Sequence, residues 1–269
     1  MDVAVSPSPV AAAPLLHDRV ALVTGASRGI GAAVACALAR HGAAVAVNYH
    51  SNRTAADAVV AAVTAAGSRG LALAADATDD AQVAAMVAAA AAEFGDIDLL
   101  VANAIGDTSG MATPDASLLD RGDEIRATVD VQLAATLSAV RRVVPGMRRR
   151  GGGTIVLIGA SLTRMTHVRA ELAEIAVAKA AQDALARHLA AELGSDGIRV
   201  NVVAPGMVPT DANAGPHRDA ALAAVGRMTP LGRVSTVDDG ADAVVALSSG
   251  LTGQVTGTVL TVDGGMTMS

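Results

Sequence analysis

A glycine-rich run near the start of the chain could bind a phosphate group. Thr24-Gly25-Ala26-Ser27-Arg28-Gly29-Ile30-Gly31 follows a short apolar stretch and precedes an alanine-rich one. Between a strand and a helix, such glycines allow a tight turn and close approach of the backbone to a pyrophosphate, which the helix N-terminus also attracts. The residues expected to contact a dinucleotide here are Gly25, Ser27, Arg28, Ile30 and Gly31. The alternative is a glycine turn without a ligand.

The residues after the next apolar run bear on which dinucleotide would bind. A site for NAD usually has an acidic residue there, hydrogen-bonded to the ribose 2′-hydroxyl. This stretch reads Val47-Asn48-Tyr49-His50-Ser51-Asn52-Arg53 and has no Asp or Glu. Arg28, with His50, Ser51 or Arg53, could instead pair with a 2′-phosphate. We therefore expect NADP(H) in preference to NAD(H), with solvated turn residues as the alternative.

The elements that must position these residues alternate along the chain. Continuous β-branched runs, typical of strands buried on both faces, separate alanine-rich stretches that often end at glycine. The expected strands are 20–24, 44–49, 70–75, 97–101, 154–158, 198–203 and 258–262, and the expected helices are 30–40, 54–66, 80–94, 118–149, 168–193 and 237–248. This order predicts an α/β fold, a single-domain doubly wound parallel sheet (Rossmann fold) of about seven strands with helices on both faces.

Two segments stand apart from this alternation. Residues 207–232 interrupt it with Pro209, Pro216 and Pro230, and we expect a mobile segment there, at the carboxyl edge of the sheet where ligands bind. Residues 1–17 carry no Lys or Arg near the start and have prolines among their apolar residues. We expect a flexible tail rather than a signal peptide, followed by one domain over residues 18–269.

Composition excludes several classes of function. The net charge is −6, and the chain has no Trp, one Tyr and one Phe, which argues against nucleic-acid binding. The arginines at 141, 142 and 148–150 are expected at a helix end, where cations are favoured. No apolar run is long enough to span a membrane. Because Cys36 is the only cysteine, no internal disulfide can form, and we expect a cytoplasmic protein without a metal site.

Five motifs resemble those of the short-chain dehydrogenase/reductase family, over about residues 18–265 and most nearly its 3-oxoacyl-carrier-protein reductase-like members. They are the TGxxxGxG loop at 24–31, Asp76 after the third strand, Ala102-Asn103-Ala104 for NNAG (with Ile105 in place of Gly), PGxxxT at 205–210 and VDGG at 262–265. By this resemblance the cofactor would also contact Asp76, Ala77, Asn103, Ala104, Pro205, Gly206, Val208 and Thr210. Members of the family commonly form homo-oligomers, so the resemblance implies a tetramer or a dimer. It also implies a small-molecule substrate.

The family's catalytic set is Asn, Ser, Tyr and Lys, and this chain departs from it. Lys179 matches the lysine, so the tyrosine of the YxxxK spacing is replaced by Ile175. Gln132 stands at the Asn position, and Ala160 at the Ser position with Ser161 one residue later. In the family the tyrosine gives a proton to the developing alkoxide, and the lysine lowers its pKa and holds the nicotinamide ribose. The resemblance thus implies that the residues that bind the cofactor are complete and that the residues that catalyse the reaction are altered.

Other groups could supply the missing proton. His167 titrates near neutral pH, although an exposed loop residue is the alternative. Glu174 adjoins Ile175, but neighbours on a helix diverge by about 100°. Tyr49, the only tyrosine, ends the second strand on the adenosine side. The candidate catalytic residues are therefore Lys179, Ser161, Gln132 and His167.

Three hypotheses from different classes follow. The first is an NADP(H)-dependent oxidoreductase that reduces a conjugated C=C bond or an activated carbonyl, since a delocalised enolate relaxes the need for the tyrosine. The second is a non-redox enzyme on the same fold, such as a cyclase, isomerase or dehydratase. The third is a catalytically silent cofactor-binding protein. NADPH consumption in step with product formation separates the first hypothesis from the other two.

Overall fold

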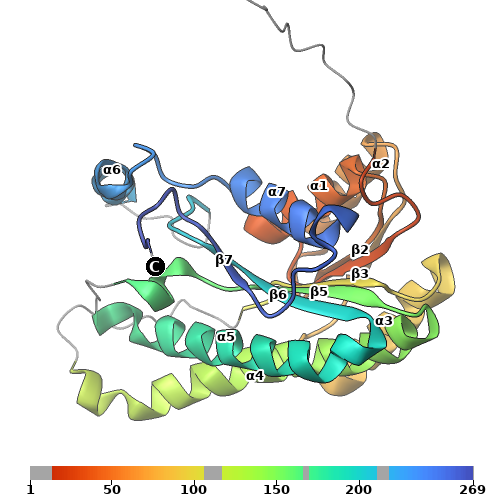
Figure 1. Cartoon of the computed structure of the whole chain (residues 1–269), viewed down its shortest axis with the longest axis horizontal. Helices are drawn as coiled ribbons and strands as arrows, with labels where there is room; N and C mark the ends of the chain where they lie inside the picture. Colours follow the sequence, from red (N-terminus) through yellow and green to blue (C-terminus); the bar gives the residue numbers. More distant parts are fainter. Residues whose placement is uncertain (1–13, 106–116, 166–169, 211–217, 269) are drawn as a thin grey trace, which may run out of the picture.

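The computed structural model of the chain describes residues 14–105, 117–165, 170–210 and 218–268 (Figure 1). The strands in this part are β1 (Val20–Val23), β2 (Ala44–Tyr49), β3 (Gly70–Ala74), β4 (Leu99–Ala102), β5 (Gly153–Ile158), β6 (Ile198–Pro205) and β7 (Val259–Val262). They pair in parallel in one sheet, in the order β3-β2-β1-β4-β5-β6-β7. This confirms the predicted doubly wound α/β fold.

Helices cover both faces of the sheet (Figure 1). One layer holds α1 (Gly29–Arg40), α2 (Arg53–Ala65) and α7 (Val237–Ser248), and the other holds α3 (Asp80–Phe94), α4 (Gly122–Arg149) and α5 (Ala173–Leu193). A further helix, α6 (Arg218–Met228), lies beyond the sheet edge. Short 3-10 turns are η1 (Leu118–Asp120), η2 (Ser161–Arg164), η3 (Ala170–Leu172), η4 (Gly194–Asp196) and η6 (Gly250–Thr252).

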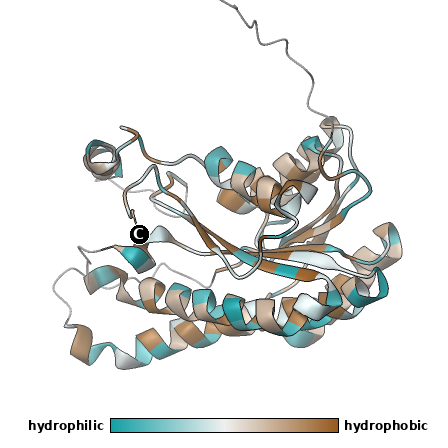
Figure 2. Ribbon diagram, viewed as in Figure 1, coloured by the Kyte–Doolittle hydropathy of each residue, from teal (hydrophilic) through white to brown (hydrophobic). Residues whose placement is uncertain are grey.

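Two apolar cores lie between the sheet and its helix layers. Side chains alternate across a strand, so Val23 packs with α1 and α7 while its neighbour Leu22 packs with α3 and α4. Figure 2 shows hydrophobic residues along the strands, and both hydrophobic and hydrophilic residues on the helices. Because both faces of the inner strands β2, β1, β4, β5 and β6 are buried, these strands read as the continuous apolar runs that predicted them, whereas the edge strands β3 and β7 are partly exposed.

The segment 207–232, which we expected to be mobile, includes a helix that was not among the expected ones. This helix is α6, whose residues Arg218–Met228 carry no proline. Pro209 and Pro230 lie on either side of this helix, and Pro216 lies outside the described residues. The prolines therefore bound a helix here rather than prevent one.

Two predicted helices begin later than expected. The one expected over 118–149 starts as η1, and α4 itself begins at Gly122. The one expected over 168–193 starts, in the described residues, as η3 before α5. The prediction that the arginine cluster lies at a helix end is confirmed for Arg148 and Arg149, which lie in the last turn of α4 and pair with Asp196 and Asp96. Arg141 and Arg142 lie about two turns earlier and pair with Asp80.

The packed part of the chain begins before residue 18. Leu16 is buried, and its backbone N–H donates to the carbonyl oxygen of His41 at 2.9 Å. Among the described residues, no helix is both long and apolar enough to cross a membrane. In the same part of the chain, no three His, Cys, Asp or Glu side chains gather in a way that could hold a metal ion.

The sheet has a topological switch point between β1 and β4. The chain leaves β1 for β2 on one side, whereas β4 pairs with β1 on the other. In open α/β sheets ligands bind in the crevice outside the carboxyl ends of such strands. The loop 24–31 follows β1 and Asn103 follows β4, so both lie at this crevice.

Candidate cofactor and catalytic site

The loop 24–31 turns sharply between β1 and α1 because two of its glycines have no room for a side chain. Gly25 has a φ of +61°, and a Cβ there would lie 3.0 Å from the Cα of Ala104. A Cβ on Gly31 would lie 2.5 Å from the carbonyl oxygen of Gly25. The loop therefore presents bare backbone at the carboxyl edge of the sheet.

Thr24 and Asn103 clamp this loop to the end of β4. The Thr24 hydroxyl oxygen accepts hydrogen bonds from the backbone N–H groups of Asn103 and Ala104, both at 3.0 Å. The side-chain amide of Asn103 donates in return to the carbonyl oxygens of Thr24 and Gly25, also at 3.0 Å. Predicted site residues from two strands are thus brought together, and the Asn103 amide nitrogen supports the loop.

The N-terminus of α1 is suited to an anion. Arg28 precedes the helix, is exposed and makes no side-chain capping bond, and the first turn has no acidic residue. The leading N–H groups of a helix and its positive dipole end attract phosphate. Ser27 and Ile30 are half-buried beside them. Thr210 also reaches this point, because its methyl carbon lies 3.5 Å from the position of a Cβ on Gly29.

No acidic residue directly follows β2 in the chain. Tyr49 is the buried last residue of β2, and His50 and Ser51 are exposed directly after it. Arg53 is exposed and donates to Asp57 at 3.3 Å within α2. The predicted ribose-side positions are therefore polar or cationic, and solvent reaches them.

Asp76 is held as a carboxylate after β3. Its Oδ1 accepts hydrogen bonds from the backbone N–H of Thr78 at 2.8 Å and from the Thr78 hydroxyl at 2.7 Å. These bonds lower the pKa of Asp76, and the charge of His50 adds to the effect. Ala77 beside it is buried. This edge of the crevice thus carries a fixed negative group.

Asn48 is a structural part of the site that sequence reasoning missed. It is buried in β2, where its Oδ1 accepts the Gly25 N–H at 3.1 Å and its Nδ2 donates to the carbonyl oxygen of Ala75 at 3.0 Å. The signal was a polar residue inside an otherwise apolar strand, because a buried amide needs partners. Asn48 fixes the glycine loop relative to the end of β3.

The segment after β6 is pinned to the end of β7. The Gly206 N–H donates to the Val262 carbonyl oxygen at 3.0 Å, and a Cβ on Gly206 would lie 2.8 Å from the Cβ of Asp263. Pro205 and Val208 are buried on either side of Gly206. The predicted cofactor residues 205–208 therefore lie at the carboxyl edge of the sheet.

Lys179 is buried under the end of β5. Only 4% of the residue is exposed, and its Nζ donates to the carbonyl oxygen of Ile158 at 2.7 Å and to Oε1 of Gln182 at 3.2 Å. Burial lowers the pKa of Lys179 to about 8, against the opposing effect of the Asp183 charge. Ile158 is the last residue of β5, so this ammonium group lies at the same sheet edge as the glycine loop.

The position one helical turn before Lys179 offers no hydroxyl group. Ile175 is half-buried in the first turns of α5. Tyr49 cannot replace it, because β2 lies three strands away from β5, roughly 14 Å at the usual strand spacing. The described part of the chain therefore has no tyrosine beside Lys179.

The other three predicted catalytic residues are placed differently. Gln132 is buried in α4, with its Nε2 3.5 Å from the hydroxyl of Thr136, so its amide lies along its own helix. Ser161 is buried at the start of η2, directly after Ala160. His167 lies outside the described residues. Of the predicted set, Lys179 is the one whose contacts place a titratable group at the end of β5.

A buried ion pair between Arg121 and Glu174 was not predicted. Arg121 lies at the N-terminus of α4, donates to Glu174 in the first turn of α5, and also donates to the carbonyl oxygen of Ala170 at 3.2 Å. Glu174 is buried in this pair. Neither residue has a local sequence signal, because their pairing depends on how α4 and α5 pack.

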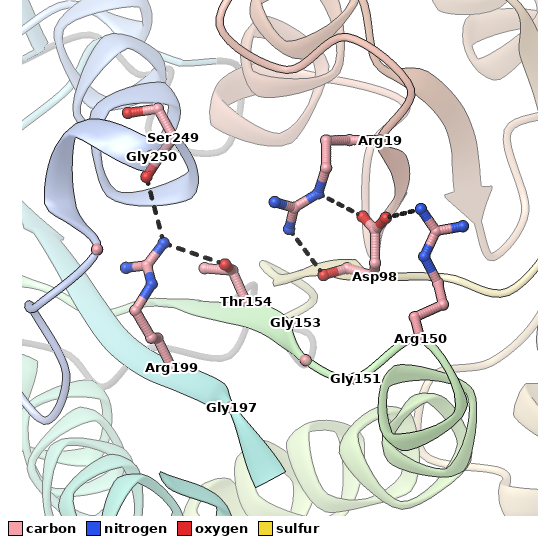
Figure 3. A pocket seen from close by; sticks show the side chains of 12 residues that line it. Arg19, Asp98, Arg150, Gly151, Gly153, Thr154, Gly197, Arg199, Ser249 and Gly250 are labelled. Carbon is pink, nitrogen blue, oxygen red and sulfur yellow. Dashed lines mark hydrogen bonds and ion pairs between the residues drawn. The ribbon is translucent and has the colours of Figure 1, made fainter.

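A cavity of about 350 Å³ lies at the opposite, amino edge of the sheet (Figure 3). Arg19 and Arg150 converge on Asp98 at 2.7 and 2.8 Å, while Arg199 donates to the Thr154 hydroxyl at 3.2 Å and to the Ser249 carbonyl oxygen at 3.4 Å. These bonds tie the ends of α4 and α7 to the sheet. The cavity is therefore structural, and the chemistry belongs to the carboxyl edge.

Comparisons with known proteins agree with this geometry. A family profile described as enoyl-(acyl carrier protein) reductase matches residues 25–267. An uncharacterized oxidoreductase of Methylorubrum extorquens is 40% identical over 93% of this chain and 98% of its own length. A 3-oxoacyl-[acyl-carrier-protein] reductase of Staphylococcus aureus is 33% identical over 92% of this chain and 98% of its own length.

A solved structure gives the same result for the fold. A 7α-hydroxysteroid dehydrogenase, in complex with NADH and 7-oxoglycochenodeoxycholic acid, matches with a TM-score of 0.81 and 31% identity. The match covers 93% of this chain and 94% of the other.

Proposed function

This chain is a member of the short-chain dehydrogenase/reductase family, and from that premise we propose that it is an NADP(H)-dependent oxidoreductase with an altered catalytic set. Its substrate is a small molecule with a C=C bond conjugated to a carbonyl, or with an activated carbonyl. The nicotinamide, when bound, supplies the hydride for such a reduction. This chain supplies the binding of the cofactor, the orientation of the substrate and the proton.

The observation that carries the proposal is a phosphate-binding turn and a buried lysine at one sheet edge. Gly25 and Gly31 permit the tight turn at the end of β1 that such phosphate-binding loops make, and Lys179 lies at the end of β5. These strands are two apart, roughly 10 Å, a separation that one dinucleotide can bridge. The residues present therefore fit a nicotinamide dinucleotide, as the NADH complex of the related dehydrogenase also supports.

Charge around the ribose favours NADP(H) over NAD(H). An acid at the end of β2 would bind the 2′-hydroxyl of NAD and repel a 2′-phosphate. This position carries His50 and Ser51 instead, and Arg28 is exposed at the start of α1. A guanidinium can bind a phosphate through two parallel hydrogen bonds.

The residues at the catalytic positions favour a substrate with a conjugated C=C bond. Ile175 has no proton to give, and Ala160 has no hydroxyl with which to hold a carbonyl oxygen. Hydride addition to an enone leaves an enolate whose charge is spread over several atoms, so it needs less help than a localised alkoxide. We therefore propose that enones are reduced faster than simple ketones.

The test is an assay of the protein with NADPH and a panel of matched enones and ketones. We expect one NADPH oxidised for each product formed, with enones preferred. Turnover without loss of NADPH would instead support a cyclase, isomerase or dehydratase. Cofactor binding with no turnover of any substrate would support a catalytically silent protein.

We also propose a homo-oligomer, a tetramer or dimer, in the cytoplasm. Val131 on α4 and Val177 on α5 are exposed apolar residues on helices that pack side by side. Cys36 is the only cysteine, which fits a compartment where thiols stay reduced.

A further inference from the structure

We propose that Lys179 itself donates the proton that completes the reduction, to the substrate oxygen on which negative charge develops. The inference rests on the proposed function, because it assigns the proton of that reaction. The lysine of the family acts on a neighbouring tyrosine, but Ile175 leaves Lys179 without one.

Lys179 is the only lysine in the sequence, beside 19 arginines. A guanidinium keeps its proton throughout the working range of proteins, whereas an ammonium group can release one. Apart from His17 with Asp18, the described ion pairs use arginine, for example Arg19 with Asp98 and Arg233 with Asp239. The one lysine therefore lies at the proposed reaction site, where a cation that can release a proton could protonate the substrate.

The Lys179 side chain reaches toward the site. Side chains on a helix generally tilt toward its N-terminus, which for Lys179 is the direction of the turn that carries Ile175. That turn is about 5.4 Å nearer the start of α5. The Nζ atom is already at the carboxyl edge, 2.7 Å from the carbonyl oxygen of Ile158. Because Ile175 is only half-buried, this direction leads out of the core.

One hydrogen of the ammonium group remains for a bound ligand. The group has three N–H donors. Ile158 and Gln182 accept two of them, and the described residues offer no acceptor for the third. These two acceptors fix the position of Nζ while leaving one donor to a ligand. Gln182 is fully buried and acts here as a positioning residue.

Burial makes this ammonium group a stronger acid than an ordinary lysine. The pKa of Lys179 is lowered to about 8 by loss of solvent, and the Asp183 carboxylate is the charged group that opposes this effect. The charges of Arg164 and Arg187 act on Asp183 in turn, and the Thr163 hydroxyl donates to it at 3.2 Å. At pH 7 about nine-tenths of Lys179 is protonated, so it is both charged and able to donate.

The proton transfer balances as follows. The substrate carbon gains a hydride, which the cofactor of the proposed function supplies, and the π bond breaks toward oxygen. The oxygen forms a bond to the proton as the N–H bond of Lys179 breaks, which leaves a neutral amine. The amine regains a proton from water after product release. A C=C substrate differs only in that the oxygen belongs to an enolate, and the enol then becomes the ketone.

The first test separates proton donation from cofactor binding. Lys179→Arg keeps the positive charge and the hydrogen-bond donors but cannot release a proton. We expect it to bind NADPH within about threefold of wild type while kcat falls at least 10²-fold. A kcat close to that of the wild type would overturn the proposal. Lys179→Met should lose both kcat and affinity for the cofactor.

The second test follows the titration itself and needs no cofactor. Because the chain has one lysine, protein labelled with ¹³C at lysine Cε gives one signal whose pH dependence reports Lys179. The donor must be protonated, so kcat/KM for reduction should fall above about pH 8. Asp183→Asn removes the charge that raises the pKa of Lys179. The NMR titration curve and the pH profile of kcat/KM should therefore both move to lower pH by the same amount.

Glu192→Gln is the matched control, since Glu192 is an exposed acid further along α5. This variant should change neither the NMR titration curve of Lys179 nor the pH profile of kcat/KM. An NMR titration that moves in Asp183→Asn without a matching change in kcat/KM would show that another group gives the proton. A wild type that oxidises no NADPH with any substrate would instead remove the proposed function, and the donor role with it. The two failures are therefore distinguishable.

Discussion

The exposed guanidinium of Arg28 stands at the N-terminus of α1, and no carboxylate follows β2 to repel a phosphate. A hydrogen bond to a charged group contributes about 1.5–3 kcal/mol. We therefore expect Arg28→Ala to weaken NADP⁺ binding by at least about tenfold and to leave NAD⁺ binding unchanged. Isothermal titration calorimetry measures both.

The control for this change is Arg40→Ala, at the other end of the same helix. It removes an equal charge far from the pyrophosphate turn, so the affinity for either cofactor should stay the same. Tighter binding of NAD⁺ than of NADP⁺ by the wild type would contradict the assigned preference.

Ile175 is the residue at which we propose that the reaction centre departs most clearly from the family. We expect the wild type to reduce simple ketones slowly and Ile175→Tyr alone to restore little of the rate. Gln132 lies along its own helix, and Ala160 offers no hydroxyl, so a new phenol would lack partners. General acid catalysis contributes about 10²–10⁴-fold, and positional errors near 1 Å can remove about 10²-fold of the rate.

The measurement compares wild type, Ile175→Tyr and the triple variant Ile175→Tyr/Gln132→Asn/Ala160→Ser on ketones and enones with NADPH. The triple variant should gain most on ketones. Full ketone reductase activity in Ile175→Tyr alone would show that the rest of the site was intact. Fast ketone reduction by the wild type would direct attention to Lys179, Ser161 and His167 as donors.

Between elements, the pair Arg121–Glu174 joins the start of α4 to the start of α5. Both side chains are buried, and breaking a buried pair leaves an uncompensated charge. We expect Glu174→Gln to lower the free energy of unfolding by about 3–5 kcal/mol, measured by urea denaturation. Replacing both partners, as Arg121→Met/Glu174→Leu, should recover much of this loss because apolar side chains of similar volume tolerate the site.

Asp123→Asn is the matched control for this pair. Asp123 faces Arg126 on the exposed side of α4, where an ion pair contributes little. The free energy of unfolding of Asp123→Asn should match that of the wild type. An equally small effect of Glu174→Gln would show that water or another group compensates Arg121.

One helix within residues 207–232 was not among the expected elements. Three prolines predicted a mobile segment that interrupts the alternation of strands and helices, and α6 forms within it. Beyond the C-terminal end of α6, the Leu231 N–H donates to the carbonyl oxygen of Gly264 at 3.1 Å. The bond joins residues from distant parts of the sequence, so no short window of residues could contain it.

For the whole molecule, the layer of α3, α4 and α5 presents apolar side chains on its outer surface. Val131 and Val177 are 37% and 45% exposed. We expect a tetramer or dimer by light scattering at micromolar concentration, with Val177→Glu shifting the mass toward the monomer because it would bury a charge. Ala62→Glu on the exposed side of α2 is the control and should not change the mass. A monomeric wild type would contradict this prediction.

Much of the fold followed from the sequence alone. Seven apolar runs between helical stretches required a parallel sheet with both faces covered, because such strands cannot stand in water. The glycine loop and the Ile175-to-Lys179 spacing were equally readable, since both depend on residues within a few positions of each other. Local periods and turn chemistry suffice for features of that kind.

Only the tertiary structure decided which distant groups meet. The hydrogen bonds from Asn103 to Thr24 join residues 79 positions apart, and Arg121 pairs with Glu174 across 53 positions. The burial of Lys179 against Ile158 depends in turn on how α5 packs under β5. Sequence spacing sets which faces are apolar, but the charge state and partners of a buried group depend on the side chains that the whole fold packs around it.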